Sequence, residues 1–126
     1  RKRQIYENLN KDKDKFLADK YNRLKERCKK ENIFFNLTKA QYIKRYHDQN
    51  GLCFYTDEIL ICWVGDGWKF NNSLSVDKII PEKGYIEGNF VFCTNRVNTA
   101  KSNFTLDEVK KYMPGWYDRL RSYGDF

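Results

Sequence analysis

Residues 74–101 read LSVDKIIPEKGYIEGNFVFCTNRVNTAK, and this stretch decides the fold. Residues 74–79 and 89–93 have the apolar and β-branched composition of two short strands, and residues 81–88 form the loop between them. Residues 94–101 have the composition of a helix. The order strand, loop, strand, helix predicts an α+β fold for this part of the chain.

Two helices are expected before this stretch. Residues 14–30 have apolar side chains at helical spacing, with lysines and arginines on the other face. Residues 32–36 are expected to be a short extended link. A second helix begins at Thr38, because Thr38 and Gln41 fit a capping box, and it ends before Gly51. The apolar stripe of the first helix consists of Phe16, Leu17, Tyr21, Leu24 and Cys28.

Further helical structure is predicted after residue 101. Thr105 and Glu108 fit a second capping box, which opens a helix that runs to about Tyr112. Pro114 ends that helix, and residues 116–123 form a last amphipathic turn or two. The C-terminal part of the chain is therefore expected to be helical and short.

The region before residue 74 is predicted to be β structure. Two apolar runs, residues 52–55 and 59–64, have the length of short strands. The Gly-Asp-Gly sequence of residues 65–67 indicates a turn, and Trp63 and Trp68 on its two sides are expected to pair across it.

The positive charge of the chain is confined to one end. The formal net charge is +7, and residues 1–30 hold twelve Lys or Arg against five Asp or Glu, whereas residues 31–126 hold equal numbers of each sign. A basic segment at one end is typical of polyanion binding, although a solvated lysine-rich helix is the alternative. The binding interpretation predicts phosphate contacts from Arg1, Lys2, Arg3, Lys11 and Lys13.

Composition also bears on location and redox state. No apolar run approaches the roughly 18–20 residues that span a membrane, and no secretory signal follows the first residues, so a cytoplasmic protein without a membrane partner is expected. The chain has no initiator Met, and both a homodimer and a longer parent chain stay open. No CxxC pair exists among the cysteines, which are expected to be reduced thiols: Cys28, Cys53, Cys62 and Cys93.

Three polar residues of the central stretch are predicted to come together. Asp77 lies at the end of the first strand, Asn98 lies on the helix, and Lys101 follows three residues later on the same helix face. One carboxylate and one amide oxygen suit Mg²⁺ or Mn²⁺, whose other positions go to water and phosphate. Taken alone, an Asp and an Asn on facing elements are more often ordinary surface or capping residues.

Several ordered motifs run through residues 75–102 as one pattern. They are Ser75-Val76-Asp77-Lys78-Ile79-Ile80-Pro81, Lys83-Gly84-Tyr85, Gly88-Asn89-Phe90-Val91 and Asn98-Thr99-Ala100-Lys101-Ser102. Together with residues 36–38 and 51–55, this pattern resembles the small phage and restriction-type HNH endonucleases over about residues 21–110. The resemblance implies a ββα-metal core, one divalent cation and hydrolysis of a DNA phosphodiester bond in a phage or microbial host cell.

The resemblance also implies roles for individual residues. Asp77 and Asn98 resemble the metal ligands of the family, and Lys101 resembles its lysine near the phosphate. Asn89 resembles the asparagine that ties the loop to the core. The expected fold is thus α+β, with an HNH core, N-terminal helices and a short C-terminal helix. Residues 1–30 are expected to be a basic helical segment and residues 31–126 the nuclease-like domain.

The chain departs from the family at the zinc positions. Relatives often carry two CxxC pairs that bind a structural zinc, and three of those four ligands are replaced here. No structural zinc is therefore expected, and the replacing side chains are expected to pack or hydrogen-bond instead. The four positions are Cys53, Thr56, Thr94 and Val97.

The second departure concerns the general base, which in relatives is usually a His directly after the Asp. Lys78 stands there, and a lysine, which titrates near ~10.4, is expected to act as a cation toward phosphate. His47 and Tyr46 are the candidate bases, since imidazole has a suitable pKa and relatives with Arg in place of the His place an aromatic hydroxyl nearby. Their alternatives are an exposed histidine at a helix end and a core aromatic paired with Tyr42.

Three hypotheses about function are considered for this sequence. The leading hypothesis is a metal-dependent DNA endonuclease. The second is a DNA-binding module that kept the HNH fold and lost efficient cleavage, which Lys78 favours. A basic RNA-binding protein is the third and most distant hypothesis.

Overall fold

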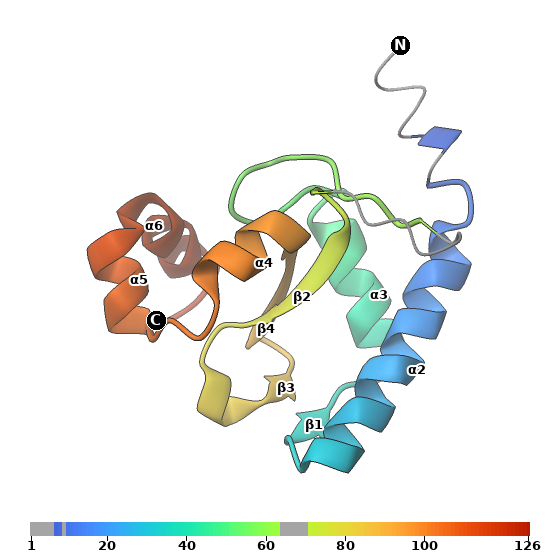
Figure 1. Ribbon diagram of the computed structural model, residues 1–126, viewed down its shortest axis with the longest axis horizontal. Coiled ribbons are helices and arrows are strands. Elements are labelled where there is room, and N and C mark those ends of the chain that lie inside the picture. The colour runs from blue at the N-terminus through green and yellow to red at the C-terminus, as the bar shows by residue number, and fades with distance from the viewer. Residues whose placement is uncertain (1–6, 9, 64–70) are drawn as a thin grey trace.

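The computed structural model describes residues 7, 8, 10–63 and 71–126, and its architecture is mixed α+β. Figure 1 shows a small central sheet with helices on both sides and the C-terminal helices at one end. The elements are α2 (Lys13–Glu31), β1 (Phe35–Asn36), α3 (Lys39–Asp48), β2 (Leu74–Lys78), the 3₁₀ helix Pro81–Lys83, β3 (Tyr85–Ile86), β4 (Phe90–Thr94), α4 (Asn95–Lys101), α5 (Leu106–Tyr112) and α6 (Pro114–Tyr123).

Two antiparallel strands, β2 and β4, form the centre of the molecule. Their register pairs Val76 with Phe92 and Asp77 with Val91. Because side chains alternate along a strand, Val76 and Phe92 lie on one face of this pair, whereas Asp77 lies on the other. This alternation determines which helix each predicted site residue can meet.

Helices α3 and α4 pack on opposite faces of the β2–β4 pair (Figure 1). On one face, the ring of Tyr42 in α3 lies 4.9 Å from Phe92 and 6.0 Å from Phe90. On the other face, Lys101 of α4 contacts Asp77 of β2. Helix α4 therefore covers the Asp77 face, and α3 covers the aromatic face.

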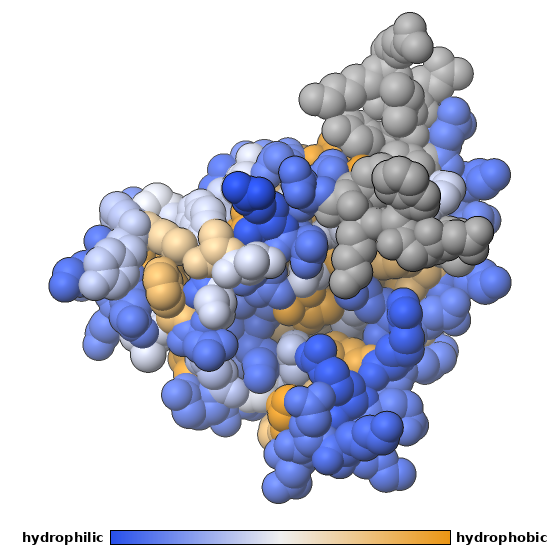
Figure 2. All heavy atoms as spheres, in the orientation of Figure 1, coloured by the Kyte–Doolittle hydropathy of each residue, from blue (hydrophilic) through white to orange (hydrophobic). Residues whose placement is uncertain are grey.

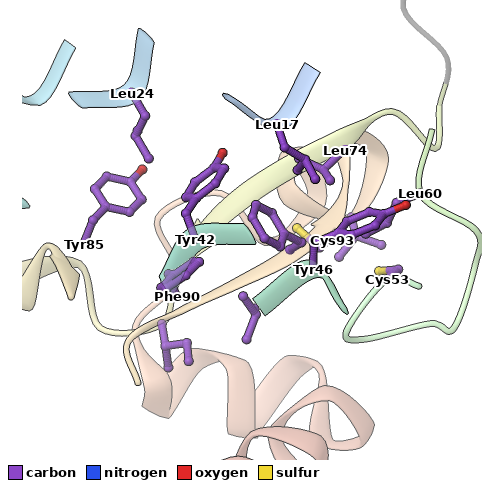
Figure 3. Close-up of a cluster of buried hydrophobic side chains, with 14 of the residues drawn as sticks. Leu17, Leu24, Tyr42, Tyr46, Cys53, Leu60, Leu74, Tyr85, Phe90 and Cys93 are labelled. Atoms are coloured by element: carbon purple, nitrogen blue, oxygen red, sulfur yellow. The ribbon is translucent and has the colours of Figure 1, made fainter. Parts of the chain in front are cut away.

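Among the described residues, an apolar core joins the helices to the sheet. Helix α2 contributes four buried side chains to it, and Tyr42 lies between α2 and Phe90 (Figure 3). Figure 2 shows that hydrophilic residues cover most of the visible face, including α2, with hydrophobic residues in small patches. Among the residues that the structure describes, no helix is long and apolar enough to cross a membrane.

Most predicted elements are confirmed. The capping boxes at Thr38 and Thr105 are both present, and the strands and helix of the central stretch match their predicted ranges within one or two residues. The last helix is longer than expected, because Pro114 begins α6 instead of only ending α5. Proline is well suited to a first helical position, where no backbone donor is lost.

The prediction of two strands over residues 52–55 and 59–64 is wrong for the described residues up to Trp63. Only isolated bridges form there, from Leu52 to Ile59 and from Ile61 to Ser73. The backbone instead forms hydrogen bonds within this segment. The amide of Cys53 bonds to the carbonyl of Glu58, and the amide of Leu60 bonds to the carbonyl of Gly51. The predicted turn and the Trp63–Trp68 pair fall on or beside residues 64–70, outside the described residues.

The segment predicted as a plain loop, residues 81–88, contains the 3₁₀ helix and β3. Strand β3 pairs in parallel with β1, which was predicted only as an extended link. Gly84 makes this approach possible, because its φ is +70° and a Cβ there would clash with the carbonyl oxygen of Phe34. The pairing brings residues 50 positions apart side by side, which no local pattern indicates.

Candidate functional site

The side chain of Asp77, on β2, is buried beneath α4 and the segment that carries Tyr55. Its side chain is 4% exposed and accepts two hydrogen bonds. The Tyr55 hydroxyl donates to Oδ2 at 2.7 Å, and the Lys101 ammonium donates to Oδ1 at 3.0 Å. Lys101 is itself only 1% exposed, so the two charges form a buried ion pair.

The environment of Asp77 acts on its charge in opposing ways. Burial raises the pKa of the Asp77 carboxyl above its usual value, whereas Lys101 and the Tyr55 hydroxyl act to lower that pKa. The pKa of Tyr55 is raised, first by burial and then by the negative charge of Asp77. Tyr55 is therefore a neutral donor toward the carboxylate.

Asn98 lies next to this pair on α4. Its Nδ2 donates to Ser75 Oγ at 2.7 Å and to the Val76 carbonyl at 3.3 Å. These bonds hold the amide nitrogen against β2, and no described residue donates a hydrogen bond to Oδ1. The two predicted metal ligands thus lie on the same face of the strand, with the Asn98 oxygen available.

Asp77 and Asn98 suit a hard divalent cation by their chemistry, because carboxylate and amide oxygens are its preferred protein ligands. A carboxylate offers about four lone-pair positions, of which Tyr55 and Lys101 use two. The remaining oxygen positions of Asp77 and Asn98 are of the chemical type that a hard cation takes, although the Lys101 ammonium already neutralises the carboxylate. Among the described residues, no group of three or more His, Cys, Asp or Glu side chains is arranged to hold a metal.

Lys78 points away from this site. It follows Asp77 on the strand, and its Nζ lies 5.3 Å from the ring centroid of Tyr85. The same tyrosine hydroxyl accepts a hydrogen bond from Arg27 of α2 at 3.2 Å. Lys78 therefore belongs to a basic group on the α2 side of the sheet.

Tyr46 and His47 are not brought to Asp77. Tyr46 is 6% exposed, and its ring lies 6.5 Å from Phe92 on the opposite face of the β2–β4 pair. Burial, together with the nearby Cys62 thiol, raises the pKa of the Tyr46 hydroxyl. His47 is exposed at the end of α3, with its ring 5.4 Å from Tyr46.

Asn89 braces the loop between β2 and β4. Its Oδ1 accepts from the Ile80 amide at 3.0 Å, and its Nδ2 donates to the carbonyls of Ile80 and Gly84 at 3.0 and 2.7 Å. The side chain is 3% exposed. Three bonds from one buried amide fix the course of the chain directly after the Asp77 strand.

The four positions considered for a structural zinc in the sequence, Cys53, Thr56, Thr94 and Val97, carry packing and capping residues. Cys53, Thr94 and Val97 are buried. Thr94 also caps α4, since its hydroxyl accepts from the Val97 amide at 3.1 Å. Thr56 is half-buried and donates to Glu58 at 2.9 Å.

The basic N-terminal residues are described only in part. Arg1, Lys2 and Arg3 lie outside the described residues, whereas Lys11 is exposed and Lys13 is half-buried at the start of α2. Directly before Lys11, the Asn10 side chain donates to the carbonyl of Leu60 at 2.9 Å and accepts from the amide of Cys62 at 2.7 Å. The chain is thus attached to the body of the protein from residue 10 onward.

Tyr55 is the site residue that sequence reasoning missed. It lies 22 positions before Asp77, inside the segment predicted as a strand. Its ring also packs against Trp116 of α6, at 5.3 Å between centroids. No spacing or motif in the sequence indicates this pairing.

Comparison with known protein families, with curated proteins and with solved structures finds no match to this chain.

Proposed function

We propose that this chain is a metal-dependent endonuclease that hydrolyses a DNA phosphodiester bond with one divalent cation, Mg²⁺ or Mn²⁺. The observation that supports the proposal is the placement of Asp77 and Asn98 on the same face of β2. Lys101, one helical turn after Asn98, reaches the Asp77 carboxylate, so α4 runs directly over this carboxylate. An antiparallel strand pair followed by a helix packed on it agrees with the ββα arrangement that the motifs of residues 75–102 imply.

Each ligand has a distinct part in this proposal. Asp77 contributes the negative charge that attracts the cation, and Asn98 contributes a neutral oxygen whose direction is set by its bonds to β2. The bound ion would stabilise negative charge on the phosphate and on the leaving oxygen. Asn89 keeps the following loop in place, and with it the end of the strand that carries Asp77.

The general base is not assigned to either sequence candidate. Tyr46 and His47 lie with α3 on the far face of the sheet, and the raised pKa of Tyr46 keeps its hydroxyl protonated and unable to accept a proton. The proposal therefore rests on charge stabilisation, which is often the largest contribution to catalysis.

A second candidate function has its own supporting observation. The Lys101 ammonium lies 3.0 Å from Asp77 Oδ1, where a metal ligand would be expected to be open, and Lys78 replaces the usual histidine base. Both features favour a DNA-binding module that does not cleave. The net charge of +7 supports DNA as the partner of either form.

Plasmid nicking separates the two functions. The full chain is incubated with supercoiled plasmid and Mg²⁺ or Mn²⁺, with EDTA as the control. Conversion to the nicked or linear form that requires the metal supports the endonuclease. A mobility shift of DNA without any nicking contradicts the endonuclease and supports the binding module.

Matched variants test the site itself. Asp77→Asn and Asn98→Ala are expected to lower cleavage by about 10–100-fold or more, as loss of metal-site groups usually does. Asp107→Asn and Asn103→Ala make the same chemical changes at exposed positions that follow α4 in the chain, and should cleave like the wild type. Thermal unfolding checks that every variant is folded. If the site variants cleave as well as their controls, the site is wrongly placed.

A further inference from the structure

The Asp77 carboxylate is held from two sides by groups of different charge. Tyr55 donates from a neutral hydroxyl at 2.7 Å, and Lys101 donates from an ammonium at 3.0 Å. Both donors are almost completely buried, with exposures of 3% and 1%. A buried ammonium requires a partner of opposite charge, and the structure gives Lys101 only this one among its described contacts.

A metal ion at Asp77 would meet the same oxygen atoms. Mg²⁺ lies about 2.0–2.1 Å from its oxygen ligands. An ammonium 3.0 Å from Oδ1 would then lie within a few ångströms of a doubly positive ion. Two cations at that separation, in a site sheltered from water, repel each other strongly. The Tyr55 hydroxyl carries no charge and does not create this conflict.

We propose that Lys101 is the built-in counter-ion of Asp77, and that Lys101 and a divalent cation are alternative occupants of this carboxylate. Binding of the metal moves the Lys101 ammonium out of its buried position, while Tyr55 keeps its bond to Oδ2 and preserves the orientation of the carboxylate. The inference rests on the proposed function, because it concerns the metal site of that function.

The position of Lys101 in the fold allows it to leave. It is the last residue of α4, and Ser102 and Asn103 after it are exposed. A flexible four-carbon stem at a helix C-terminus can carry its ammonium to solvent, near carbonyl groups that favour a positive charge. There the released cation would lie close to a phosphate bound by the metal, which is the role that the family pattern implies for this lysine.

Amine labelling of the wild-type protein tests this exchange directly. Lysines are acylated with a limiting reagent, and the rate at each position is measured by peptide mass spectrometry with and without Mg²⁺ at a concentration that calorimetry shows to be saturating. Without metal, Lys101 should react at least about tenfold more slowly than the exposed Lys110, because reaction requires local opening. With Mg²⁺, the rate at Lys101 should rise by about the same factor, whereas Lys110 should not change. Continued protection of Lys101 while Mg²⁺ is bound would overturn the inference.

Metal affinity provides a second, independent measurement. Mn²⁺ binding is followed by the loss of the free-ion signal in electron paramagnetic resonance. Lys101→Met removes the competing ammonium and should bind Mn²⁺ at least about tenfold more tightly than the wild type. Lys78→Met removes one positive charge next to Asp77 that makes no bond to it, and its effect should be clearly smaller. Equal effects of the two variants, or none, would contradict the inference. If Lys101→Met does not fold, labelling of the wild type decides.

The outcomes separate this inference from the proposed function. Tight Mn²⁺ binding by Lys101→Met alone, with no cleavage by the wild type, supports the counter-ion role and contradicts the endonuclease. Cleavage and metal binding by the wild type with Lys101 still protected support the endonuclease and overturn the counter-ion role. Absence of Mn²⁺ binding in both proteins contradicts both.

Discussion

Lys101 Nζ lies 3.0 Å from Asp77 Oδ1, and neither side chain is more than 4% exposed. This buried pair joins the last turn of α4 to the strand residue that the sequence motif singles out. Burial removes both charges from water, which costs free energy. Each charge offsets this cost for the other. Removal of one partner leaves an uncompensated charge.

The first prediction concerns this pair. Lys101→Met is expected to lower the free energy of unfolding by about 3–5 kcal/mol at pH 7, because Asp77 is left buried without its cation. The double variant Asp77→Leu with Lys101→Met removes both charges and should be considerably more stable than the single variant. Urea denaturation of the three proteins measures both differences. A double variant that is no more stable than Lys101→Met would show that the unpaired Asp77 charge is not the cause of the lost stability.

A second prediction concerns Tyr55. Tyr55→Phe keeps the ring that packs on Trp116 and removes only the hydroxyl that donates to Asp77. The expected loss of stability is about 1.5–3 kcal/mol, typical of a hydrogen bond to a charged group. The control is Tyr112→Phe, whose ring is 58% exposed and whose stability should not change. Equal stability of the two variants would argue against a structural role for the Tyr55 hydroxyl.

Gly84 and Gly88 provide a matched pair in the loop. Both have positive φ, but a Cβ at Gly84 would clash with the backbone of Phe34, whereas a Cβ at Gly88 would meet nothing within 4 Å. Gly88→Ala should therefore cost about 1 kcal/mol from backbone strain alone. Gly84→Ala should cost clearly more, because β3 must also move away from β1. Thermal unfolding of both variants measures the difference, and a smaller loss at Gly84 would contradict the close approach of these strands.

The pH dependence of stability is predicted from Cys62. Burial raises the pKa of its thiol from 9.0 to about 12. Between pH 9 and about pH 12, the native state keeps the thiol proton while the unfolded state loses it. This contribution to stability is therefore complete below pH 9 and is lost as the pH rises toward 12, by up to about 1.4 kcal/mol per pH unit. Urea denaturation between about pH 7 and 10.5 should show a shallower decline for Cys62→Ala than for the wild type. Identical slopes would mean that the thiol does not titrate differently on folding.

The last prediction concerns DNA affinity. Replacement of Arg1, Lys2 and Arg3 by Ala should weaken DNA binding and reduce the slope of log affinity against log salt by about 0.9 for each phosphate group that these residues neutralise. Substitution is preferred to a longer deletion, because Asn10 bonds to Leu60 and Cys62 and its removal would disturb the fold. The control removes three positive charges elsewhere, at Lys83, Lys110 and Lys111. If both variants have the same affinity and the same slope, the N-terminal residues are not a specific phosphate-binding arm.

The sequence by itself determined the helices, the strands β2 and β4, and their order along the chain. The boxes at Thr38 and Thr105 begin helices because side chains three residues apart satisfy free backbone amides, which is a local effect. The strands around Asp77 and Phe92 follow from composition, and helical spacing places Asn98 and Lys101 on one face. All of these depend on residues that are close along the chain.

Tertiary structure decided how Asp77 is buried and that Tyr55, which no motif indicated, bonds to its carboxylate. Tyr55 reaches the carboxylate from a segment without regular structure, and Lys101 is buried because α4 packs over β2. Strand alternation and the positions of α3 and α4 place Tyr46 on the far face of the sheet from Asp77. Such contacts join residues that are distant in the chain, and their free energy comes from desolvation and packing in the assembled core. A local pattern contains neither quantity, so it indicated Lys101 near Asp77 but neither the burial of that pair nor the bond from Tyr55.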